Sequence, residues 1–249
     1  DHLGHGKSLP EGGTPVYFGQ GSTWNTVVDD IYILHQRLKQ RYPDVPLCIM
    51  GHSMGSFLTR TYLIRYPGTV KAAVIMGTGW QPQAAITGGL ALANAIAAVS
   101  GENATSELVT ELAFGSYNKL FAPNRTKVDW LSADESNVDD YIADPLCGAD
   151  ATVGLFRQML HGIRFNQRQS HLRQMDREMP VLFVAGDKDP VGSCGKGVRQ
   201  TYDAFRSAGM RDCTLKLYPG LRHEILNEKA YTADITKNIE AWLLSRLEK

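Results

Sequence analysis

The sequence predicts an α/β protein: a mostly parallel β-sheet with helices on both faces and a helical cap. Short apolar runs of the kind that form buried parallel strands alternate with helical segments along the chain. About a hundred residues without such a run separate the second expected strand from the third, which indicates an insertion. We therefore expect a first core part over residues 1–78, a cap over 79–177 and a second core part over 178–249.

The first core part is expected to contain two strands, each following or preceding a helix. Apolar residues within 24–41 share one helical face, with Thr23 as the N-cap and Pro43 ending the helix. A helix of this kind buries one stripe against a sheet and exposes the other. The elements expected after it are a buried strand over 46–50, a helix over 57–66 and a second buried strand over 72–76.

The cap is expected to be helical, rich in small residues at first and charged later. Its most apolar stretch, residues 84–99, is interrupted by polar and glycine positions and is shorter than the roughly 20 residues of a membrane-spanning helix. We expect a cap helix there that packs on the core, lines a pocket, or touches a lipid surface transiently. The second core part should then hold strands over 181–185 and 213–218, a helix over 196–207 and a closing helix through 235–243.

Composition and charge exclude several classes of protein. The 249 residues are 43% hydrophobic and 21% charged, which is typical of a globular chain and not of disordered or fibrous ones. The 26 basic residues are balanced by 26 acidic ones, so a dedicated nucleic-acid partner is not expected. Four widely spaced cysteines show no metal-binding or disulfide pattern. We expect reduced, partly buried thiols, no metal, and a cytoplasmic protein.

A candidate nucleophile lies between an expected strand and an expected helix. Residues 51–55 read GHSMG and fit G-x-S-x-G, the sharp turn that exposes a nucleophilic serine above a sheet. The pattern alone is weak, but this position in the chain favours Ser53 as a nucleophile over an ordinary turn serine. The backbone N–H of Met54, the next residue, is the expected oxyanion donor.

A nucleophilic serine needs a base, and seven histidines compete for that role. Only His223 lies in a loop between the last expected strand and the last helix, where this fold class carries its catalytic histidine. The alternative is a structural histidine. His52 adjoins Ser53, but its side chain should diverge from the serine. We therefore predict His52, together with Trp80, as a substrate-binding residue.

The carboxylate that orients the base should follow a strand between Ser53 and His223 in the chain. Residues 186–190, GDKDP, follow the third expected strand and offer two aspartates. Asp187 comes directly after a glycine and would bond backbone N–H groups within the turn. Asp189 extends further and can reach an imidazole, so the sequence favours Asp189.

These motifs together resemble the monoacylglycerol lipase and lysophospholipase branch of the serine α/β-hydrolases. The resemblance covers nearly all of the chain and rests on the motifs DHLGHGKS at 1–8, GHSMG at 51–55, GDKDP at 186–190 and RHEILNE at 222–228, with VDWL and YIADPLCG in the cap. It implies an α/β-hydrolase fold, a Ser53, Asp189 and His223 triad, and hydrolysis of a small acyl-ester substrate without a cofactor. It leaves the acyl chain and head group open.

The resemblance also implies an N-terminally truncated fold. In the family, a second oxyanion donor precedes the segment that here begins at Asp1, so the first strands and that donor are expected to be missing. His5 and Gly6 match a later glycine turn, and we expect them to be structural. The alternatives to an ester hydrolase are a thioesterase or acyltransferase and a catalytically weak lipid-binding fragment. The oligomeric state stays open.

Overall fold

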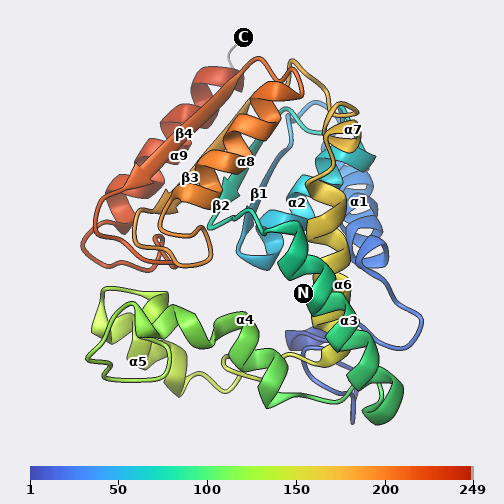
Figure 1. Cartoon of the computed structure of the whole chain (residues 1–249). Helices are drawn as coiled ribbons and strands as arrows, with labels where there is room; N and C mark the ends of the chain where they lie inside the picture. The colour runs from blue at the N-terminus through green and yellow to red at the C-terminus, as the bar shows by residue number, and fades with distance from the viewer. Residues whose placement is uncertain (248–249) are drawn as a thin grey trace.

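The computed structural model describes residues 1–247 and contains a parallel four-stranded sheet in the order β1-β2-β3-β4 (Figure 1). Each strand pairs with the next in parallel register, with Cys48 opposite Ala72 and Val181 opposite Cys213. The predicted α/β class is thereby confirmed. The strands are β1 (Cys48–His52), β2 (Ala72–Met76), β3 (Val181–Gly186) and β4 (Cys213–Tyr218), so only the first expected strand is displaced, by two residues.

Helices cover both faces of this sheet, as predicted. One face of β2 and β3, with Ile75 and Phe183, packs in a large core with α1 (Trp24–Arg41), α2 (Met54–Arg65) and α8 (Lys196–Ser207). The opposite face, with Val74 and Val184, packs against α9 (Thr232–Leu247). Alternate strand residues therefore enter different cores, and every residue of β2 and β3 is buried. A continuous apolar run is what this two-sided burial requires.

Local signals place the ends of the first helix. The Thr23 hydroxyl accepts the backbone N–H of Thr26, while the Thr26 side chain accepts the N–H of Thr23, which forms a capping box. Val27 and Val28 are fully buried against the core. The N-cap and the helix bounds predicted for this segment are confirmed.

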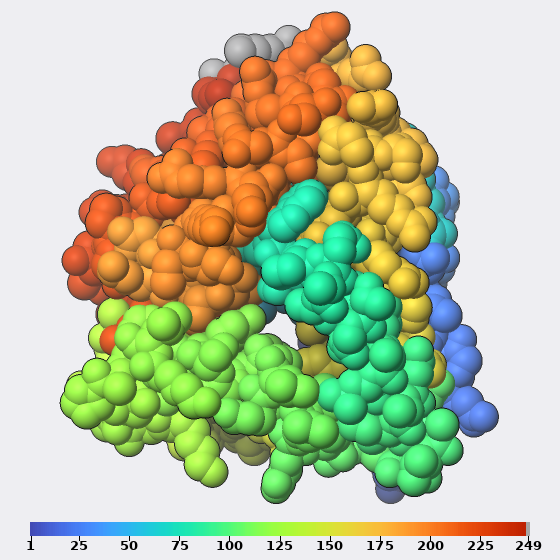
Figure 2. All heavy atoms as spheres, in the orientation of Figure 1, coloured from blue at the N-terminus to red at the C-terminus, as the bar shows by residue number. Residues whose placement is uncertain are grey.

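The segment between β2 and β3 is helical, and both of its ends return to neighbouring strands because β2 and β3 pair directly. Helix α6 packs against α1, α2 and α3, whereas α4 and α5 lie beyond the carboxyl ends of the strands (Figure 1). Figure 2 shows the molecule hollowed between the α3 and α4 segments. The helices are α3 (Gln83–Ser100), α4 (Glu107–Lys119), η2 (Asp129–Leu131), α5 (Glu135–Ala143), α6 (Val153–Asn166) and α7 (Gln169–Leu172); η1 (Gly6–Ser8) precedes them near the N-terminus.

Helix α3 covers the apolar stretch predicted at 84–99. It buries Ile86, Leu90 and Ala93, and most of its remaining surface is accessible. By length and composition it is also long and apolar enough to cross a membrane, with a mean hydropathy of 1.3. Only 17% of this stretch is buried, and α3 packs against α6.

The four thiols are unpaired, and their burial differs in part from the expectation. Cys147 and Cys213 are half-buried, as predicted, but Cys48 and Cys194 are exposed. Cys48 begins β1, a strand at the edge of the described sheet. Burial raises the pKa of the Cys213 thiol to about 11, so this group stays protonated near neutral pH.

Candidate active site

Ser53 occupies a strained turn between β1 and α2. Its backbone has φ 53° and ψ −121°, a region that non-glycine residues rarely adopt, and its N–H donates to the carbonyl of Met76 at 3.1 Å. Gly51 makes this turn possible, because a Cβ there would lie 2.2 Å from the carbonyl oxygen of Gly55. Gly55 itself has open space around it, so close packing explains only the first glycine of the motif.

Met54 begins helix α2, directly after the serine. The first N–H groups of an α-helix have no carbonyl partner within the helix, and they carry the positive end of its dipole. Ser53 and Met54 both line the same cavity. This arrangement suits the Met54 N–H to an oxygen that gains negative charge beside Ser53.

His223 and Asp189 meet at the carboxyl end of the sheet. Nδ1 of His223 donates to Oδ2 of Asp189 at 3.0 Å, and Oδ1 of Asp189 accepts the N–H of Val191 at 2.9 Å. Both side chains are almost completely buried, so water does not compete for this contact. Asp189 therefore fixes the imidazole in the tautomer that leaves Nε2 free as a proton acceptor.

The two aspartates after β3 have different partners. Oδ1 of Asp187 accepts the N–H of Gly220 at 2.8 Å, and its own N–H donates to the carbonyl of Tyr218. Asp187 thus joins the β3 loop to the β4 loop and does not contact His223. Of the two candidates, the structure brings Asp189 to the histidine.

His52 supports His223 from the side of the sheet. Its Nε2 donates to the backbone carbonyl of His223 at 3.0 Å, and the two ring centroids are 4.5 Å apart. Burial, and after it the neighbouring His223, lowers the pKa of His52 to about 4, so the ring is neutral near pH 7. Gly77, with φ 57°, lies beneath both rings, and a Cβ there would be 3.1 Å from each.

One cavity lies between the sheet and the cap helices, and a second, adjoining one lies among the cap helices alone. The serine cavity, about 810 Å³, is lined by residues of both, including His5, His52, Ser53, Met54, Trp130 and His223. The apolar cavity, about 390 Å³, lies between α3, α4 and α6, and none of the described residues that line it carries a charge. Both volumes are within the range of small-molecule sites. The two cavities share Gln81, Phe114, Tyr117, Phe156, Met159 and Ile163.

Sequence reasoning missed the aromatic residues that the cap contributes. The ring of Trp130 lies 5.2 Å from that of His223, and Tyr117 meets Trp130 edge-on at 5.2 Å. Burial raises the pKa of Tyr117 to about 12, and the charge of Asp189 acts in the same direction. The motif VDWL contains Trp130, but no local pattern predicts its place beside His223, because that contact joins distant parts of the chain. The predicted Trp80 is half-buried and does not line either cavity.

Comparisons with known proteins identify the family to which this chain belongs. The model of the Hydrolase_4 family, serine aminopeptidase S33, matches residues 1–230. A monoacylglycerol lipase from Mycolicibacterium smegmatis is 31% identical, with the alignment covering 99% of this chain and 77% of the relative. The human monoglyceride lipase is 27% identical, with 99% and 72% covered.

Solved structures give the same fold. A thermostable carboxyl esterase from Bacillus coagulans, in complex with glycerol, superposes with a TM-score of 0.90 at 25% identity, covering 98% of this chain and 79% of the esterase. A monoglyceride lipase from Saccharomyces cerevisiae has a TM-score of 0.74 at 16% identity, covering 99% and 76%. The chain therefore belongs to the Hydrolase_4 family, serine aminopeptidase S33, within the esterase and lipase group of serine α/β-hydrolases.

Proposed function

We propose that this protein hydrolyses carboxylic esters of acyl chains, monoacylglycerols among them, with Ser53 as nucleophile, His223 as base and Asp189 as orienting acid. The observation that carries the proposal is the buried Asp189–His223 pair, which opens onto the same cavity as the strained Ser53. A serine turn, a histidine and a carboxylate converging from three separate loops is the arrangement that acyl transfer requires.

The reaction follows from this geometry. Oγ of Ser53 attacks the ester carbonyl carbon while Nε2 of His223 accepts the hydroxyl proton. The Met54 N–H stabilises the oxyanion, and the alcohol leaves with the proton that His223 returns. Water then attacks the acyl-enzyme, His223 taking its proton, and the carboxylic acid is released with Ser53 restored. Asp189 stabilises the imidazolium of His223 in both acylation and deacylation.

The apolar cavity supports an acyl chain as the substrate's larger part. The transfer of an acyl chain from water into a cavity lined by alanine and leucine side chains and by glycine backbone is favourable in free energy. The ammonium group of a peptide substrate would lose its hydration there without a carboxylate to pair with. The serine cavity, by contrast, is lined by polar residues such as Asn118 and Glu224, which suit the hydroxyl groups of a glycerol head. Several relatives of this chain carry names of monoglyceride lipases.

The test is covalent labelling of Ser53. A fluorophosphonate probe should label the wild-type chain, and the label should be lost in Ser53→Ala, together with hydrolysis of p-nitrophenyl butyrate and of a monoacylglycerol. Ser207→Ala, an exposed serine at the end of α8, is the control and should be labelled normally. Labelling that persists in Ser53→Ala would contradict the proposal. A faster reaction with an acyl thioester, or with an aminoacyl p-nitroanilide, would favour a thioesterase or an aminopeptidase instead.

A further inference from the structure

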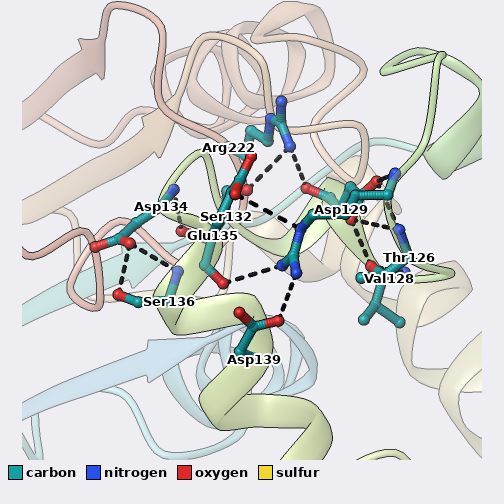
Figure 3. A network of polar contacts seen from close by, with 10 residues as sticks. Thr126, Val128, Asp129, Ser132, Asp134, Glu135, Ser136, Asp139 and Arg222 are labelled. Carbon is teal, nitrogen blue, oxygen red and sulfur yellow. Dashed lines mark hydrogen bonds and ion pairs between the residues drawn. The ribbon is translucent and has the colours of Figure 1, made fainter.

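The loop that carries His223 forms hydrogen bonds with both the carbonyl and the N–H groups of one backbone segment of the cap. This segment, residues 129–134, contains Trp130 and is named here the tryptophan segment. Arg222 donates through Nη1 to the backbone carbonyls of Asp129 and Ser132, the latter at 3.0 Å (Figure 3). The guanidinium also lies 4.0 Å from the ring of Phe121. A planar donor group fixed by a ring and by two carbonyls has little freedom.

Glu228 and Glu224, in the same loop as Arg222, form further hydrogen bonds with this segment. The buried carboxylate of Glu228 accepts the N–H groups of Ala133 at 2.8 Å and Asp134 at 3.1 Å. The backbone N–H of Glu224 donates to the carbonyl of Leu131 at 2.8 Å. Bonds to both donors and acceptors of one short backbone stretch fix its position as well as its orientation, because hydrogen bonds are directional.

The segment presents Trp130 to the imidazole of His223. The backbone N–H of Trp130 donates to Oδ1 of Asn118 at 3.0 Å, and its ring stacks near Phe114 as well as near His223. An indole within about 6 Å attracts a cation placed over its face. His223 becomes a cation only after it accepts the proton of Ser53, so Trp130 would stabilise the transition state more than the ground state.

Resting on the proposed function, we infer that Arg222 and Glu228 are positioning residues: they hold the tryptophan segment so that Trp130 stays against the catalytic histidine. Each acts through Trp130 and touches no reacting atom. Arg222 directly precedes His223 in the chain, so the same short loop carries the base and fixes the aromatic group beside it. Residues 222–228 therefore set the position of the tryptophan segment relative to His223.

The experiment compares Arg222→Gln, Arg222→Lys and Glu228→Gln with wild type on p-nitrophenyl butyrate, each also in a Trp130→Leu background. Arg125→Gln is the matched control, because Arg125 pairs with Asp139 within the cap and does not reach the His223 loop. We expect Arg222→Gln and Glu228→Gln to lower kcat about fivefold with KM nearly unchanged. Arg222→Lys should recover part of the loss, and Arg125→Gln should match wild type.

The Trp130→Leu background decides whether the effect passes through the indole. Neither Arg222→Gln nor Glu228→Gln should lower kcat further there, because residues acting through one group are not additive. The inference would be overturned if the losses of kcat were additive in the Trp130→Leu background, if the single variants only raised KM, or if kcat did not change. The rate of amide hydrogen exchange in residues 129–134 should rise in both variants. This measurement tests whether Arg222 and Glu228 hold the segment, without relying on activity. Failure of the proposed function is distinct, because wild type and Ser53→Ala would then hydrolyse the ester equally.

Discussion

The two walls of the serine cavity are built in different ways. The wall on the sheet side consists of loops that end strands: Ser53 follows β1, Val191 follows β3 and His223 follows β4, with Gly77 and Asp189 buried behind them. Their positions follow from the strand register and from close backbone approaches. The wall on the cap side consists of helices whose aromatic and small side chains leave space, and it is tied to the core by polar contacts around residues 129–134.

This difference separates chemistry from selectivity. In the proposed mechanism the sheet wall holds the groups that move protons and electrons, so a change there should affect every ester alike. The cap wall surrounds the parts of the substrate that do not react, so a change there should distinguish one ester from another. The tryptophan segment is the exception, because it belongs to the cap but its Trp130 ring lies beside that of His223, the proposed base.

The largest effect is expected in the sheet wall, from Asp189→Asn. An asparagine at this position holds the wrong tautomer of His223, so kcat should fall by about 10⁴-fold. The loss should be the same for short-chain and long-chain esters, measured as initial rates at pH 8. Asp187→Asn is the control, since Asp187 bonds Gly220 and not His223, and it should retain most of the activity. A loss that depends on chain length would break the distinction between the walls.

A smaller and selective effect is expected in the cap wall, from Gly88→Leu. Gly88 lines the apolar cavity, and a Cβ added there would have no atom within 4 Å, so leucine would fill space without a backbone clash. We expect kcat/KM for a long-chain monoacylglycerol to fall at least about tenfold, with p-nitrophenyl butyrate unaffected. Ala91→Leu, on the exposed side of α3, should change neither. Equal losses for both substrates would place the acyl chain elsewhere.

The smallest effect at neutral pH is expected at His52. Its pKa in the folded protein is about 4, below the usual 6.5, so the unfolded chain binds more protons between these values. Stability from the neutral ring is complete above pH 6.5 and is lost as the pH falls toward 4, by about 3 kcal/mol in the limit. His52→Gln can still donate to the His223 carbonyl, and its urea midpoint should fall less than that of wild type between pH 7 and pH 4.5. If the urea midpoints of the two proteins fell by the same amount over this pH range, His52 would not be the titrating group.

Much of the fold could be predicted because its signals are local. The strand over 72–76 and the helix over 196–207 match their predicted bounds, since a buried strand and an amphipathic helix each carry their own periodicity. The candidate triad could be named for a similar reason: each member follows a recognisable strand. Asp189 could be preferred to Asp187 only by an argument about reach, which the contact with His223 now supports.

The sequence by itself determined the α/β class, the serine turn and the three loops from which the candidate triad comes, because these depend on residue type and on distance along the chain. Only the tertiary structure decided that His52 bonds the His223 carbonyl, that Gly77 lies beneath both rings and that Arg222 and Glu228 bond the backbone of residues 129–134. These contacts join residues far apart in the chain, and no short-range pattern encodes them. The cavities are likewise a property of packing, since they exist only where helices from separate segments fail to fill the space between them.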